Sequence, residues 1–175
     1  MTKNQIILAV VAFVAGILIV GSLGKNKNNS GQIPTGETTQ NTNIFSNLSD
    51  LCLTIPKEKI TSLYGEPIVK TETFTRSNSW TCEYFVDATN FVGLHLENMS
   101  VENQKKGNTF LDRTIEASSK IPMENFLARN EKGDIVDIYL VLGPNQYVRV
   151  SRSSSTKIPE DKYINFASKV VGLIK

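Results

Sequence analysis

The chain has one histidine, His95, and two cysteines, Cys52 and Cys82, among its 175 residues. Every mechanism that relies on a Ser–His or Cys–His pair must therefore pass through His95. A tetrahedral zinc site needs four ligands, which two cysteines and one distant histidine cannot supply. We therefore expect neither a metal site nor a cofactor.

Catalytic motifs are also missing. The sequence has no phosphate-binding glycine loop, no His-Glu zinc helix and no Gly-x-Ser-x-Gly elbow. His95 alternates with Leu94 and Leu96, so we expect it opposite their core face, exposed on the sheet surface. Several carboxylates are available, but their spacing singles out no pair: Glu72, Glu83, Glu97, Asp134 and Asp137. The sequence thus predicts a protein that is not an enzyme.

Long hydrophobic runs are absent except at the N-terminus, where residues 6–23 are almost entirely apolar. As a helix this run would span roughly 27 Å, close to the ~30 Å hydrocarbon core of a bilayer. A cleavable signal has a shorter apolar region, so we interpret residues 1–24 as an uncleaved membrane anchor. A signal removed near residues 22–24 is the alternative. The run contains no cysteine, which excludes lipid attachment there.

Composition divides the rest of the chain into a linker and a domain. Residues 25–47 are rich in Asn, Gly, Thr, Ser and Gln, and they have too few large apolar side chains to offset the entropy of ordering. We expect a flexible linker with a reach of roughly 25–30 Å. Residues 48–175 are enough for one hydrophobic core and should form a single domain.

Acidic residues are absent before Glu37. Three of the 19 basic residues (Lys3, Lys25 and Lys27) flank the apolar run, which leaves 16 basic against 17 acidic residues in the remainder. The net charge of +2 therefore belongs to the membrane flanks. A nearly neutral domain argues against nucleic acid as a partner. Because lysines lie on both sides of the run, the positive-inside bias is close to a tie.

The two cysteines favour a domain outside the cytoplasm. An even pair without metal-ligand spacing suits an oxidising compartment. A bond between Cys52 and Cys82 would close a loop of about 30 residues and stabilise the domain by roughly 3–4 kcal/mol. Two unpaired buried thiols in a cytoplasmic domain are the alternative interpretation.

Apolar periodicity predicts an α+β domain with a mainly antiparallel sheet and the order α-βββ-α-βββ-α. Cys82 should point into the core, and the strand over residues 135–142, apolar on both faces, should be central. One helix is expected to begin near Pro56, a second to span residues 108–119 and a third to begin at Pro159. The strands are expected over residues 68–75, 79–87, 92–96, 126–129, 135–142 and 147–152.

Three short motifs, Leu51-Cys52-Leu53, Leu63-Tyr64-Gly65 and Trp80-Thr81-Cys82, resemble a layout in small exported bacterial domains that are anchored by a helix or a lipid. The resemblance covers about Leu51–Tyr84. Those domains, mostly of uncharacterised function, often pair a cysteine before the first helix with one in the second strand. The resemblance implies the disulfide and the exported location, and it carries no catalytic residue. This chain lacks the lipid-attachment cysteine common in that group.

The best candidate for ligand binding lies in the strand over residues 147–152. Tyr147 and Arg149 share one face, and Arg152 follows at the end of the strand. An aromatic ring beside a guanidinium suits a carboxylate, a sugar acid or a headgroup. A solvated strand face is the alternative interpretation.

Together these features predict a single-pass, membrane-tethered extracytoplasmic module of the cell envelope with a binding or scaffolding role. The expected partners are the membrane, through residues 6–23, and an envelope polymer or a neighbouring membrane protein. A small envelope-acting hydrolase is one alternative, and it would need His95 or a carboxylate pair in a pocket. A subunit of a surface filament or secretion assembly is another, although the processing motif of pilin-like chains is absent.

Overall fold

The computed structural model of the chain describes residues 50–155 and 158–174. The predicted anchor over residues 6–23 and the predicted linker over residues 25–47 lie outside these ranges and stay predictions. Within the described ranges, no helix is long and apolar enough to cross a membrane.

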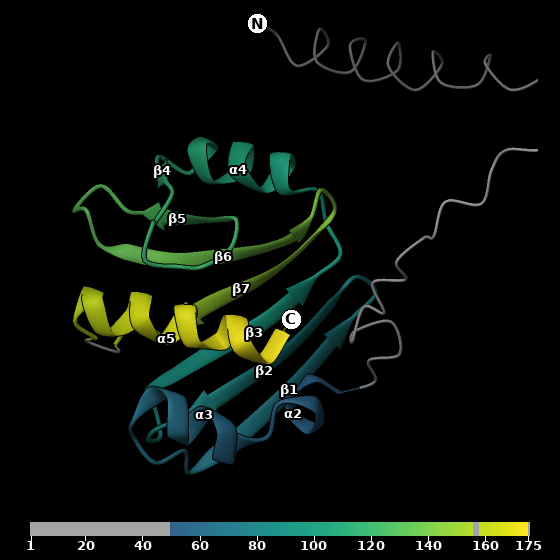
Figure 1. Cartoon of the computed structure of the whole chain (residues 1–175), viewed down its shortest axis with the longest axis vertical. Coiled ribbons are helices and arrows are strands. Elements are labelled where there is room, and N and C mark those ends of the chain that lie inside the picture. The colour runs from purple at the N-terminus through teal and green to yellow at the C-terminus, as the bar shows by residue number, and fades with distance from the viewer. Residues whose placement is uncertain (1–49, 156–157, 175) are drawn as a thin grey trace, which may run out of the picture. The chain divides into compact units, whose positions relative to one another are not determined.

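Seven antiparallel strands form one sheet in the order β1-β2-β3-β7-β6-β5-β4 (Figure 1). Two meanders, β1–β3 and β4–β7, are joined by pairing of β3 with β7, in which Leu94 lies opposite Val150. The elements are α2 (Leu51–Thr54), α3 (Lys57–Tyr64), β1 (Lys70–Arg76), β2 (Ser79–Phe85), β3 (Phe91–Glu97), α4 (Val101–Phe110), β4 (Thr114–Glu116), β5 (Asn125–Arg129), β6 (Ile135–Gly143), β7 (Gln146–Arg152) and α5 (Glu160–Ile174). The α+β class and the antiparallel sheet are confirmed.

The order of elements differs from the prediction in the middle of the chain, where the helix expected over residues 108–119 is wrong. The observed α4 begins after Ser100, whose Oγ accepts a hydrogen bond from the N–H of Asn103. The helix ends just before Asp112, whose φ of 56° is left-handed. Ile115, expected on that helix, lies instead in the short strand β4, which was not predicted. The helix α2 was not predicted either.

The main core lies on one side of the sheet, here called the helix face, which carries Cys82, Leu94 and Val150. Figure 1 shows α3 and α5 over this side. The predicted apolar stripe of α5 is buried, and Phe166 meets Tyr64 of α3 edge to face at 5.3 Å. Burial of this stripe on the sheet is the main driving force that holds α5 in place.

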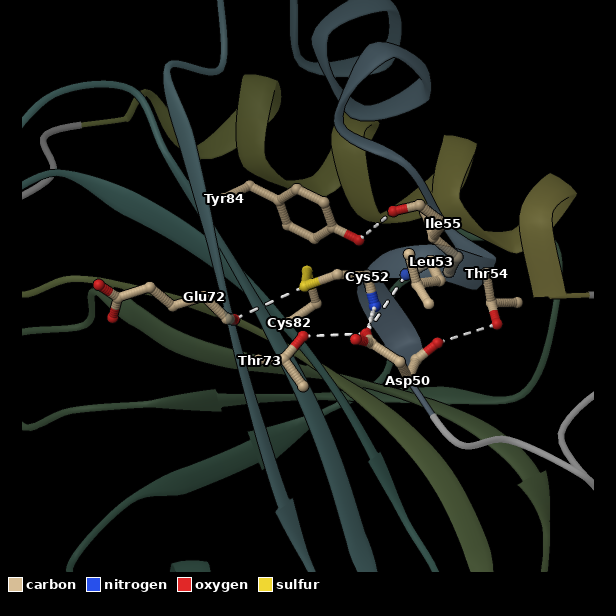
Figure 2. The surroundings of a disulfide bond; sticks show 9 residues. All are labelled: Asp50, Cys52, Leu53, Thr54, Ile55, Glu72, Thr73, Cys82 and Tyr84. Carbon is tan, nitrogen blue, oxygen red and sulfur yellow. Dashed lines mark hydrogen bonds between the residues drawn. A yellow bond between two sulfur atoms is a disulfide. The ribbon is translucent and has the colours of Figure 1, made fainter.

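The predicted disulfide joins Cys52 of α2 to Cys82 of β2, with the two Cα atoms 5.2 Å apart (Figure 2). The Asp50 carboxylate caps α2 by accepting the N–H of Cys52 at 2.7 Å, and it also accepts the Thr73 hydroxyl of β1 at 2.9 Å. The Tyr84 hydroxyl donates to the carbonyl of Ile55 at 2.6 Å. The bond and these contacts hold the start of the domain against the β1–β2 edge of the sheet.

Candidate functional site

The opposite side of the sheet, here called the pocket face, is divided into two parts. Over β5–β7 it is covered, because Val101 of α4 packs in one apolar cluster with Phe126, Tyr139 and Tyr147. Over β1–β3 the same face lines a pocket of about 630 Å³. Its walls carry Thr81, Glu83, His95, Glu97 and Arg149, with Phe74, Arg76 and Met99 around them.

His95 lies in the wall of this pocket and is only 9% exposed. Its Nδ1 is 2.9 Å from the Thr81 Oγ1, and its Nε2 is 2.7 Å from the Ser151 Oγ. The predicted face is therefore correct, but the expected exposure is wrong. Strand alternation assigns a side chain to a face and does not reveal which distant hydroxyls enclose it there.

The environment of His95 keeps its ring neutral. Burial first, and then the nearby Arg149 guanidinium, lower the pKa of His95 to about 3. A general base works best when its pKa lies near the working pH, so His95 is a weak base for activating Ser151. Its Nδ1 also contacts a hydroxyl in place of the carboxylate that orients the histidine of a catalytic triad.

Gly93 makes room for this arrangement, and sequence reasoning did not identify it. A Cβ at this position would lie 2.6 Å from the Ser151 Oγ and 2.8 Å from the His95 Nε2. A side chain at position 93 would therefore displace the Ser151 hydroxyl or the His95 ring and disrupt the hydrogen bond between them. A glycine inside a strand is the available sequence signal, since it often marks a close approach.

Arg149 connects the pocket to the covered part of the pocket face. Its Nη1 is 3.4 Å from the Asp137 Oδ1, and its Nη2 is 3.7 Å from the Glu97 Oε1. The other oxygen of Asp137 accepts from Arg113 at 3.0 Å, and Arg113 also donates to the Asn108 Oδ1. Two carboxylates therefore already compensate the charge of Arg149.

The structure does not bring the three predicted binding residues together. Arg149 lines the pocket, as proposed. Tyr147 is on the same face but is buried, and its hydroxyl donates to the Gln104 Oε1 of α4 at 3.0 Å. Arg152 lies on the helix face, where its guanidinium is 5.4 Å from the ring centroid of Tyr163. Of the three predicted residues, only Arg149 lines the pocket, and Tyr147 and Arg152 do not.

Three charged groups of the pocket were not predicted as binding residues and are poorly paired. The side chains of Glu83 and Arg76 have no hydrogen-bond or ion-pair partner among the described residues. Glu97 is 11% exposed, and its contact with Arg149 at 3.7 Å is longer than a hydrogen bond. Burial first, and then the Glu72 carboxylate, raise the pKa of Glu83. These groups are available to a ligand.

No protein-family model, curated protein or solved structure matches this chain. Within residues 50–155 and 158–174, no group of three or more His, Cys, Asp or Glu side chains is placed to hold a metal ion. The geometry of the pocket is therefore the basis on which a function is proposed.

Proposed function

We propose that this chain is a membrane-tethered extracytoplasmic binding module of the cell envelope, and that it binds its ligand in the pocket over β1–β3. The observation that carries the proposal is the contrast between the pocket and the interior. In the described part of the chain, every fully buried side-chain nitrogen or oxygen has a hydrogen-bond partner. Two carboxylates of the pocket depart from this rule, because Glu83 is half-buried without a side-chain partner and Glu97 is buried with only a 3.7 Å contact to Arg149, so a ligand would satisfy them.

The location rests on two features. The disulfide between Cys52 and Cys82 suits an oxidising compartment. The apolar run over residues 6–23 has the composition and length of a membrane anchor. A domain anchored in this way would meet envelope polymers and neighbouring membrane proteins.

A small hydrolase remains the second candidate because two carboxylates, Glu83 and Glu97, share the pocket. The raised pKa of Glu83 is the property that a catalytic acid requires. We favour binding because the strand register places Glu83 opposite Gly93, four residues from Glu97 along β3. This backbone separation of roughly 13 Å is larger than the roughly 5–9.5 Å between the two carboxyl groups of a glycosidase.

Site-specific photocrosslinking in intact cells tests the pocket as the binding surface. A benzophenone amino acid replaces Met99, which is 48% exposed at the pocket, or Leu53, which is 79% exposed on α2. Illumination of the full-length chain should give a discrete adduct from position 99 and none from position 53. Addition of Glu83→Ala to the Met99 variant should remove the adduct, since Glu83 lines the same pocket.

Leu53 is a matched control because it is also apolar, is more exposed and belongs to a different surface. Adducts of equal yield from both positions would indicate non-specific contact. That outcome, or no adduct from position 99, would contradict the proposed binding surface.

A further inference from the structure

The pocket contains groups that need hydrogen-bond donors and a group that needs acceptors. Glu83 and Glu97 are carboxylates, which accept hydrogen bonds when ionised, and neither receives one from the described residues. Arg76 carries five N–H donors without a partner in the described part of the chain. A complementary ligand must therefore carry both hydrogen-bond donors and acceptors.

The charge of the pocket favours a neutral ligand. Two guanidinium groups, Arg76 and Arg149, share it with two carboxylates, Glu83 and Glu97, and the buried ring of His95 is neutral near pH 7. A cationic ligand would meet both arginines, and an anionic one would meet both glutamates. Hydroxyl groups are neutral and serve as donor and acceptor at one atom, so they satisfy both kinds of group.

The position of the pocket on the face of the sheet argues against a peptide. Peptides that bind sheets usually add a strand at an edge, where backbone N–H and C=O groups are unpaired. Here β2 pairs on both sides, with β1 and with β3. The edge strand β1 has unpaired backbone groups, but they lie in the plane of the sheet and not on the face that lines the pocket. Recognition must come from side chains.

The pocket also has an apolar platform beside its charged groups. Phe74 of β1 is 49% exposed and lies across from Thr81 in the strand register. A sugar ring presents hydroxyls at its rim and C–H groups on its faces, and an aromatic ring covers such an apolar face well. The volume, about 630 Å³, is in the range of small-molecule sites.

We propose that the pocket over β1–β3 binds a short segment of a neutral glycan, whose hydroxyls donate to Glu83 and Glu97 and accept from Arg76 while one sugar ring rests on Phe74. The inference rests on the proposed binding function and adds the chemical class of the ligand.

Calorimetric titration of the full-length chain in detergent micelles tests the ligand class. The probes are tetrasaccharides of glucose, mannose, galactose and N-acetylglucosamine, with tetra-alanine and spermidine as the peptide and the cation. At least one tetrasaccharide should bind saturably. Glu83→Gln and Phe74→Ala should each weaken its binding about ten-fold or more, because charge-assisted hydrogen bonds and aromatic contacts are lost.

The matched control is Glu58→Gln, which changes an exposed carboxylate on α3 and should leave the dissociation constant unchanged. Both pocket variants should fold, because Glu83 has no partner and Phe74 is half exposed. Equal thermal midpoints would verify this. If the protein cleaves a bound tetrasaccharide and Glu83→Gln abolishes this cleavage, the glycan ligand would be supported. The function would then be that of the hydrolase and not that of a binding module.

Three results would overturn the glycan assignment. The first is binding of tetra-alanine or spermidine in preference to every tetrasaccharide, and the second is tetrasaccharide binding that neither variant weakens. The third is no binding of any tetrasaccharide at about 10 mM, a concentration that would nearly saturate a site with a dissociation constant of about 1 mM. If any of these three results were obtained while position 99 still gave an adduct in cells, the binding function would be supported and the ligand class would be wrong. Loss of the adduct would instead remove the binding function.

Discussion

The double substitution Cys52→Ala/Cys82→Ala is expected to lower the free energy of unfolding by about 3–4 kcal/mol. The bond links residues 30 apart in sequence, and the enclosed loop contains α3, β1 and part of β2. Without it, the unfolded chain regains the entropy of that loop while the native contacts of α2 largely remain. Urea denaturation of the variant and of the wild type measures the difference directly.

The wild type treated with reductant is the matched control for this experiment. It should lose about the same stability as the double variant, because both lack the cross-link. The Asp50 cap on the Cys52 N–H and its hydrogen bond with the Thr73 hydroxyl are each worth about 1 kcal/mol, so they cannot replace the bond. A loss below about 1 kcal/mol in both samples would show that the bond contributes little to stability.

Acidification from pH 7 to pH 5 is expected to cost the wild type about 2 kcal/mol of unfolding free energy through His95 alone. The pKa of His95 is about 3 in the folded protein, against about 6.5 in an unfolded chain. As the pH falls below about 6.5, the unfolded state takes up a proton that the native state excludes. The contribution is therefore fully present above pH 6.5 and is lost progressively as the pH falls towards about 3.

His95→Gln supplies the control, because His95 is the chain's only histidine. The variant should be less stable at pH 7, since Gln cannot reproduce both the Thr81 and the Ser151 contacts. Its stability should nevertheless change little between pH 7 and pH 5. Equal slopes for the two proteins in this window would contradict the buried, neutral state of His95.

Much of the fold was predictable because strand alternation and helical periodicity are local signals. The apolar stripe of α5 and the inward direction of Cys82 both follow from residue spacing, and both are confirmed. Strand β6 is buried on both faces, as its apolar residues predicted, and it lies between β5 and β7. The disulfide was predictable because the chain has one pair of cysteines without metal-ligand spacing.

The position of α4 could not be predicted, because this helix has almost no apolar stripe. Only Val101 and Asn108 are buried on it, and Asn108 is held by polar contacts to Tyr139 and Arg113. The apolar residues that suggested a later helix have other roles. Leu111 is exposed, and Ile115 packs from strand β4.

The pocket depends on contacts between residues far apart in sequence. His95 reaches Ser151, 56 residues away, and Arg149 reaches Glu97 across the β3–β7 pairing. The same geometry explains why Tyr147 is not available as predicted: α4 covers it. Arg152 follows Arg149 by an odd number of residues, so strand alternation already assigned it to the opposite face.

The location of the domain is tested most directly by protease accessibility and thiol labelling on intact cells. A C-terminal tag on the full-length chain should be cleaved by protease added outside the cytoplasmic membrane. Cys52 and Cys82 should resist alkylation until a reductant is added, as the disulfide requires. A tag that is protected until the cells are lysed, together with cysteines that react without reductant, would contradict an extracytoplasmic domain.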